Sequence, residues 1–302
     1  YSTHPNPRVG CVIARGDLVL GEGWHERAGE AHAETRALSQ AGTDAPGATA
    51  YVTLEPCSHF GRTPPCARAL IDAGVAHVYA ATKDPNPSVS GRGLDMLRDA
   101  GVRVTEGLLA EEATRLNPGF MKRMNTGRPW VRLKMAASLD GRTAMASGES
   151  QWITGEASRA HGHRERARAD AILVGGGTLR ADAPRLDVRL AGLKGRSPRR
   201  VALTSGKVPE GWQAIRSPEE ITALDGVRYL MVEGGAQTAS AFLAAGLVDR
   251  LLIYRAPVLL GGGTPAIGNI GHDTLKAAFA DGLAMQDRRT LGSDTLEVYQ
   301  RG

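Results

Sequence analysis

The fold class is indicated most clearly by one motif, which consists of His32-Ala33-Glu34, then Pro56-Cys57, and then Cys66. One imidazole and two thiolates can fill three of the four tetrahedral positions of a zinc ion, which leaves the fourth open to water. Zinc lowers the pKa of such a water from about 15.7 toward about 7. A carboxylate two residues after the histidine is placed to carry protons rather than to bind the metal. We therefore predict a catalytic zinc site with His32, Cys57 and Cys66 as ligands and Glu34 as general acid/base.

Each part of this pattern is weak alone. His-x-Glu is common by chance, and free cysteines are usually small buried hydrophobes. A structural zinc site would need a fourth ligand, for which His59 lies between the two cysteines. His-x-Glu followed about two dozen residues later by Pro-Cys is, however, the signature of hydrolytic deaminases. The third cysteine, Cys11, lies in the apolar run Val9–Ala14, and we interpret it as a core residue.

The composition is that of a globular protein of two domains. The chain has 302 residues, of which 42% are hydrophobic and 23% charged, and its net charge is +5. This modest charge does not indicate a nucleic-acid partner, and no apolar run reaches the ~20 residues that span a bilayer. Three cysteines make a disulfide framework unexpected. With no recognisable signal peptide, we expect a cytoplasmic protein without a membrane partner.

The first half alternates strand-like and helix-like segments, which is typical of a layered α/β domain. Strands are expected at 9–14, 18–23, 48–54 and 75–82, and helices at 32–41, 65–73 and 93–100. His32 and Cys57 thus lie near junctions of strands and helices, where such sheets place their ligands.

The turn-forming run Asn125–Pro129 is the best candidate boundary, so we expect domains at 1–127 and 128–302. The second half again alternates, with strands expected at 130–136, 171–174, 200–203, 229–232, 251–254 and 296–300 and helices at 156–169 and 237–245. The segment 189–200, rich in Gly, Pro and Arg, is expected to be a mobile surface loop.

Glycines follow two apolar strands of the second half, in Gly175-Gly176-Gly177 and Gly234-Gly235. Exposed backbone amides at such turns suit a phosphate or a dinucleotide, although glycines at strand ends are as often simple turns. Neither run fits Gly-x-Gly-x-x-Gly, because Arg180 stands where the third glycine would be. The Rossmann fingerprint is therefore absent.

Nearly the whole chain resembles the bifunctional pyrimidine deaminase/reductase family of riboflavin biosynthesis. The motifs that match its deaminase half are Pro5-Asn6-Pro7, His32-Ala-Glu34, Tyr51 to Cys66 and Asp84-Pro-Asn-Pro87; those that match its reductase half are Ser138-Leu-Asp-Gly141, Ser150-Gln-Trp-Ile-Thr154 and Glu233-Gly-Gly235. Eight residues separate the two cysteines, whereas deaminases acting on nucleic acids usually carry Cys-x-x-Cys.

The resemblance implies a cytidine-deaminase-like zinc domain followed by a dihydrofolate-reductase-like α/β domain, with Zn²⁺ and NADPH as cofactors. It implies substrate contacts by Asn6, Ser150, Arg166, Leu186, Arg189 and Glu233. It implies cofactor contacts by Ala136, Trp152, Thr178, Asp182 and the turn from Gly235. The implied substrate is a phosphorylated pyrimidine, and homodimers or homotetramers are expected.

The sequence departs from the family pattern at two places in the second half. Asp182-Ala183-Pro184 stands where the family often has two aspartates before the proline, and Asp187 stands where a threonine or asparagine is common. An added carboxylate near a phosphate site is expected to weaken binding.

Two other classes of function predict different features. A deaminase of tRNA or single-stranded DNA would need basic patches interleaved with aromatic residues, but the chain has only four Trp, six Tyr and four Phe. A zinc-stabilised scaffold without catalytic activity would make Glu34 dispensable.

Overall fold

The computed structural model describes residues 3–58, 64–87 and 89–301, which form two compact units, Tyr1–Gly127 and Arg128–Gly302. The division falls at Gly127, whose φ of 71° ends the last helix of the first unit. A left-handed residue of this kind favours glycine and stops a helix. His59, considered above as a fourth metal ligand, lies outside the described residues.

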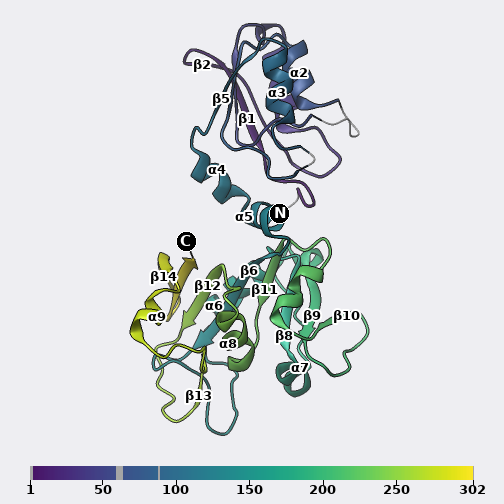
Figure 1. The fold of residues 1–302 in the computed structure, drawn as a ribbon. Coiled ribbons are helices and arrows are strands. Elements are labelled where there is room, and N and C mark those ends of the chain that lie inside the picture. Colours follow the sequence, from purple (N-terminus) through teal and green to yellow (C-terminus); the bar gives the residue numbers. More distant parts are fainter. Residues whose placement is uncertain (1–2, 59–63, 88, 302) are drawn as a thin grey trace. The chain divides into compact units, whose positions relative to one another are not determined.

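Unit 1 is built on a five-stranded sheet in the order β2-β1-β3-β4-β5 (Figure 1). The strands are β1 (Gly10–Arg15), β2 (Leu18–Trp24), β3 (Thr49–Val52), β4 (His77–Ala80) and β5 (Arg103–Glu106). β1 pairs antiparallel with both β2 and β3, and β3, β4 and β5 are parallel. The parallel strands are joined through helices, as parallel pairing requires.

The helices of unit 1 are α1 (Ala33–Ala41), α2 (Cys66–Asp72), α3 (Arg92–Asp99), α4 (Ala110–Leu116) and α5 (Pro118–Thr126). The first three cover the core formed by residues such as Ile13, Leu70 and Leu94. α1 lies unusually close to β2, because a Cβ at Gly23 would stand only 2.5 Å from the carbonyl oxygen of Ala33. Glycine in β2 therefore allows the approach that sets the position of the first turn of α1.

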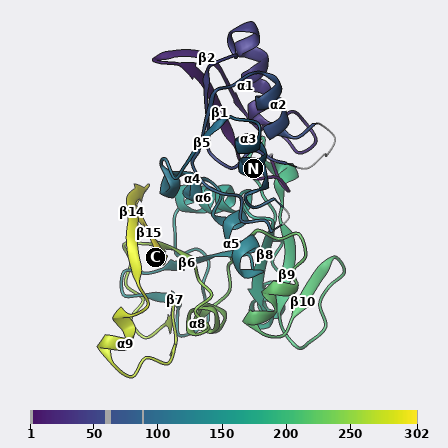
Figure 2. The same cartoon turned by 45° about the horizontal axis from the view of Figure 1, so that its top comes forward.

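Unit 2 contains an eight-stranded sheet in the order β10-β9-β8-β11-β6-β12-β15-β14, with β10 and β14 at its two edges (Figures 1 and 2). Its strands are β6 (Trp130–Ala137), β8 (Ala171–Gly175), β9 (Arg199–Leu203), β10 (Trp212–Ile215), β11 (Tyr229–Val232), β12 (Arg250–Arg255), β14 (Leu283–Leu291) and β15 (Asp294–Arg301). The strands from β10 to β12 in this order are parallel, and the last two pair antiparallel. β7 (Arg142–Ala144) and β13 (Thr264–Pro265) form a separate pair.

Helices α6 (Glu156–Arg166), α7 (Gly176–Asp182), α8 (Ala236–Ala244) and α9 (Leu275–Phe279) complete this unit. Alternation along β6 separates its two faces. Val131 and Leu133 join the core that contains Phe242 of α8, whereas Arg132 faces Glu165 of α6. The sheet is thus covered on both faces, as is usual when its strands are parallel.

The expected elements are present, but several observed ones had no clear sequence signal. These are β5, α4, α5, β7, α7, β10, β13, α9 and β14. The loop expected at 189–200 is partly regular, since Lys194–Arg196 form a 3₁₀ turn and β9 begins at Arg199. No helix in the described part of the chain is long and apolar enough to cross a membrane.

Candidate active sites

In unit 1, three potential metal ligands converge from three different elements. His32 caps the N-terminus of α1, Cys57 follows β3, and Cys66 is the first residue of α2. His32 Nδ1 lies 3.2 Å from Cys66 Sγ and 3.6 Å from Cys57 Sγ, and all three ligand atoms lie within 4.8 Å of one another. One imidazole nitrogen and two sulfurs at this spacing suit zinc.

The protonation states of the three side chains depend on one another. The Cys66 thiol, and after it the His32 ring, hydrogen-bond to Cys57 and lower its pKa to about 4. The same contact raises the pKa of Cys66, and the hydrogen bond to Cys57 raises the pKa of His32. These shifts favour the thiolate form of Cys57 and the thiol form of Cys66, so binding of a metal by both sulfurs would release the Cys66 proton.

Glu34 lies in the first turn of α1 beside this cluster and is only 3% exposed. Burial raises the pKa of its carboxyl group above the ordinary range, and the Cys57 sulfur adds to this effect. A buried carboxyl group that hydrogen-bonds a ligand sulfur without completing the ligand set is suited to hold and release a proton.

His25, which the sequence did not single out, fixes the orientation of Asn6. The Asn6 amide donates to His25 Nε2 at 3.0 Å, and His25 Nδ1 donates to the Ala31 carbonyl oxygen at 3.2 Å. Burial lowers the pKa of His25, which favours this neutral tautomer. His25 also borders a 500 Å³ pocket lined by Arg8, Trp24, Arg27 and others. A histidine directly after a strand was the only sequence signal for it.

A second residue without a recognised role, Glu55, ties down the turn that carries Cys57. Its buried carboxylate accepts backbone N–H groups from Asp84, Gly91 and Gly93 at 3.1, 2.9 and 3.0 Å. A Cβ at Gly93 would lie 1.9 Å from the Pro56 carbonyl oxygen, so the first turn of α3 packs directly on the turn that carries Cys57. Glu55 thus links the Asp84–Pro87 motif to the candidate metal site.

In unit 2, a buried group of charges lies where β11 ends. Arg166 of α6 donates two hydrogen bonds to the Glu233 carboxylate, at 2.7 and 2.8 Å, and Lys134 Nζ lies 3.9 Å from it. Burial opposes ionisation of Glu233, but Lys134 and then Arg166 outweigh it and leave its pKa below the ordinary range. Lys134 also lies over the ring of Tyr254. The sequence contained Lys134 but gave no indication that it meets Glu233.

The loop that carries Leu186 and Arg189 joins this group through its backbone. Arg166 Nη1 donates to the Asp187 carbonyl oxygen at 3.2 Å. Leu186 is 5% exposed with φ 52°, and Arg189 is exposed beside His163. Ser150 lies on an exposed segment after β7 and takes no part in these contacts.

All but one of the residues predicted to contact a nucleotide cofactor lie near the carboxyl ends of parallel strands or in the helices that follow them; the exception is Trp152. Ala136 is near the end of β6, Thr178 and Asp182 are in α7, and Gly235 caps α8. Thr178 Oγ1 lies 3.7 Å from where a Cβ of Gly235 would be, so the starts of α7 and α8 are neighbours. Trp152 is 65% exposed and lies under the Arg159 guanidinium.

The glycines of this region also have a packing role. A Cβ at Gly175 or Gly234 would lie 2.2 or 2.3 Å from side-chain atoms of Thr238, and one at Gly176 would lie 2.7 Å from Thr204 Oγ1. These positions exclude larger residues whether or not a phosphate binds there.

Comparison with known proteins agrees with the division of the chain into units 1 and 2. The cytidine and deoxycytidylate deaminase zinc-binding region matches residues 1–82, and the RibD C-terminal domain matches 129–223 and 219–291. The riboflavin biosynthesis protein RibD of Escherichia coli is 47% identical over 86% of this chain and 84% of its own length. That of Haemophilus influenzae is 42% identical over 99% and 92%.

The chain belongs to the RibD family. Acinetobacter baumannii RibD superposes with a TM-score of 0.89 at 41% identity, covering 100% of this chain and 94% of that one. A Thermotoga maritima protein, described as a diaminohydroxyphosphoribosylaminopyrimidine deaminase/5-amino-6-(5-phosphoribosylamino)uracil reductase, has a TM-score of 0.83 at 30% identity with the same coverage.

Membership of the RibD family confirms the predicted family and the predicted order of a zinc deaminase domain and a reductase domain, both α/β. It also confirms a bifunctional enzyme of riboflavin biosynthesis, which replaces the scaffold and nucleic-acid alternatives. The roles of individual residues and the identity of the nicotinamide cofactor remain predictions.

Proposed function

We propose that unit 1 deaminates 2,5-diamino-6-ribosylamino-4(3H)-pyrimidinone 5′-phosphate and that unit 2 then reduces the ribosyl side chain of the product to ribityl with NADPH. The observation that supports this most directly is the convergence of His32, Cys57 and Cys66 beside buried Glu34, in a RibD-family chain that also carries the reductase domain. The proposal places both activities in one polypeptide, which we expect to be cytoplasmic and a homodimer or homotetramer.

In unit 1, His32, Cys57 and Cys66 would hold Zn²⁺, which when bound supplies a Lewis acid that makes a water nucleophilic near neutral pH. Glu34 takes a proton as the water adds to the ring carbon that bears the 2-amino group. It transfers this proton to the ring nitrogen. As the C–N bond breaks, it takes a second proton from the hydroxyl group added to the ring and gives it to the amino group, which leaves as ammonia. The Asn6 amide, oriented by His25, holds the pyrimidine.

In unit 2, NADPH when bound supplies a hydride for C1′ of the opened ribose. Ala136, Trp152, Thr178, Asp182 and the turn at Gly235 are the proposed cofactor contacts. Arg166, Glu233, Leu186, Arg189 and Ser150 are the proposed substrate contacts. To these we add Lys134, whose ammonium group lies 3.9 Å from Glu233 and can donate a proton as the opened sugar is reduced.

The division of labour can be tested by mass spectrometry of the zinc-loaded enzyme with the diaminopyrimidine ribotide, first without and then with NADPH. We expect one amino group to be exchanged for oxygen without cofactor, and two hydrogens to be gained when it is added. No change in either sample would refute the substrate, and reduction before deamination would refute the order.

One variant tests whether the two sites act separately. Arg189→Ala should leave the rate of ammonia release unchanged and weaken the NADPH-dependent step, because Arg189 is proposed to hold the 5′-phosphate in unit 2 alone. Equal losses in both steps would contradict this assignment.

A further inference from the structure

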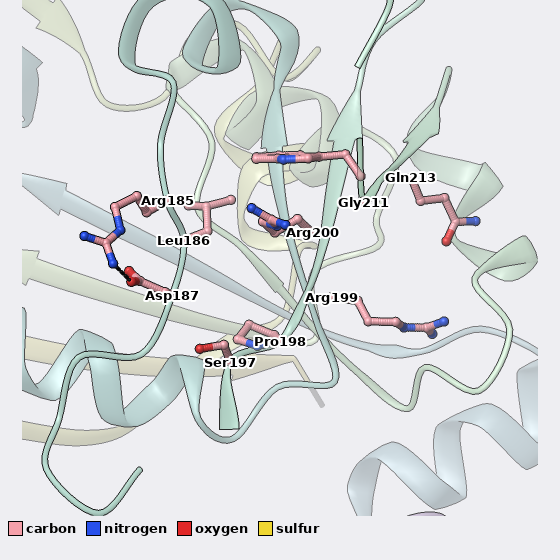
Figure 3. Close-up of a pocket in the computed structure, with 10 residues that line it drawn as sticks. Arg185, Leu186, Asp187, Ser197, Pro198, Arg199, Arg200, Gly211 and Gln213 are labelled. Atoms are coloured by element: carbon pink, nitrogen blue, oxygen red, sulfur yellow. Dashed lines mark ion pairs between the residues drawn. The ribbon is translucent and has the colours of Figure 1, made fainter. Parts of the chain in front are cut away.

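The loop Arg185–Arg189 places a carboxylate beside the arginine proposed to bind the substrate phosphate. Leu186 and Val188 are buried, which holds the backbone of Asp187 between them in position. Figure 3 shows Arg185, Leu186 and Asp187 along one wall of a 540 Å³ pocket, with Asp187 directed toward Arg185. The position of Asp187 is therefore set by packing on both sides of it in the sequence.

Asp187 interacts with two arginines of its own loop. One carboxylate oxygen, Oδ2, lies 2.7 Å from Arg185 Nη2, and the other, Oδ1, lies 3.7 Å from Arg189 Nε. Oδ1 is buried and accepts no hydrogen bond from the residues that the structure describes. The carboxylate is thus paired firmly with Arg185, and its free oxygen is directed toward Arg189.

Arg189 is held only loosely by this carboxylate. At 3.7 Å the contact is electrostatic attraction without a hydrogen bond, and the Nε–H group of Arg189 is instead directed to His163 Nε2 at 3.4 Å. Half of the Arg189 side chain is exposed. Its guanidinium can therefore turn to an incoming anion, but the carboxylate would remain within a few ångströms of that anion.

We propose that Asp187 is an internal counter-anion that weakens the binding of phosphate at Arg189 and thereby raises the KM of the reduction. This rests on the proposed function, in which Arg189 binds the 5′-phosphate. A carboxylate near 4 Å from a phosphate oxygen repels it, and it also neutralises part of the charge of the arginine that attracts it. The same repulsion makes the site less sensitive to inhibition by inorganic phosphate.

The test is Asp187→Asn in the full zinc-loaded chain, because asparagine keeps the shape and removes the charge. One charge pair at this distance in an exposed site corresponds to about a fivefold change in affinity. We expect the KM of the phosphorylated substrate and the inhibition constant of inorganic phosphate both to fall about fivefold. Both differences from the wild type should shrink in ~1 M salt, where the Debye length is about 3 Å. Deamination should be unchanged.

Arg185→Ala should change KM and the phosphate inhibition constant in the opposite direction. Without its short partner, the Asp187 carboxylate is free to pair with Arg189, so KM and the phosphate inhibition constant should rise. Glu210→Gln, an exposed residue near the same pocket, removes the same charge and should change neither constant.

Unchanged or increased constants in Asp187→Asn, in an enzyme that still carries out the reduction, would refute the proposal. Failure of the wild type to gain two hydrogens would instead refute the proposed function. A fall in both constants that persists in high salt would point to a rearranged loop and would also count against the counter-anion.

Discussion

Glu233→Gln tests whether the buried charges of unit 2 are as tightly coupled as their geometry indicates. The substitution keeps the size of the side chain and removes its charge. In the wild type, Glu233 and Arg166 are 8% and 16% exposed, and two short hydrogen bonds join them. Lys134 has the same carboxylate as its ionic partner. The variant leaves Arg166 and Lys134, both partly buried, without this carboxylate as an ionic partner.

The expected loss of stability follows from these contacts. Removing one partner of a buried ion pair costs about 3–5 kcal/mol, because the other charge remains buried. Glutamine can still accept one of the two hydrogen bonds from Arg166, which is worth about 1 kcal/mol. We therefore expect the free energy of unfolding of unit 2 to fall by about 2–4 kcal/mol.

Urea unfolding of the full chain, followed by tryptophan fluorescence, measures this loss. Trp130, Trp152 and Trp212 lie in unit 2, and only Trp24 lies in unit 1. With a slope of about 2–3 kcal/mol per molar urea, the midpoint should shift by about 1 M. Glu149→Gln, an exposed control in the same unit, should shift it by less than about 0.2 M. A shift no larger than the control would refute the reasoning.

The same pair predicts a pH dependence. The pKa of Glu233 is lowered in the folded state, so its contribution is complete above the ordinary pKa of 4.5 and is lost as the pH falls through the lower folded value. The stability difference between wild type and Glu233→Gln should therefore disappear in acid. A difference that is constant from neutral pH to about pH 2 would show that the charge is not the cause.

Three further predictions concern other parts of the molecule. Glu34→Gln should retain zinc, measured by metal analysis, and lower the rate of ammonia release by about 10²–10⁴-fold. A loss of zinc or near-normal turnover would contradict the role of Glu34 in proton transfer. Glu55→Gln should weaken zinc binding about tenfold in chelator competition, because one of three backbone N–H donors would then face an amide N–H group. Unchanged zinc affinity would show that the Cys57 turn keeps its position without the Glu55 carboxylate. Burial lowers the pKa of both His161 and His163, so the unfolded chain binds more protons than the folded chain below pH 6.5. The free energy of unfolding of unit 2 should therefore decrease as the pH falls below 6.5. Replacing both histidines by glutamine should flatten this dependence on pH, and an unaltered dependence would locate its cause elsewhere.

Much of the fold was predictable because its strands and helices carry local signals. The apolar strands β8 and β11 and the helix α1 with its terminal glycine are examples. The edge strand β14 was not predictable, since its exposed positions show no apolar alternation and only pairing with β15 makes it a strand. α9 was missed for a similar reason, because its residues are all exposed.

By itself the sequence determined which residues to propose for the candidate metal site, since His32, Glu34, Cys57 and Cys66 form a motif whose residue types and spacing are typical of zinc-dependent deaminases. Only the tertiary structure decided which distant charges meet. Arg166, the last residue of α6, meets Glu233, which directly follows β11. The Asp187 carboxylate faces Arg189 because buried Leu186 and Val188 fix the backbone of the loop. Such contacts depend on strand order and packing, which join residues far apart in the chain and leave no mark on the local pattern of either segment.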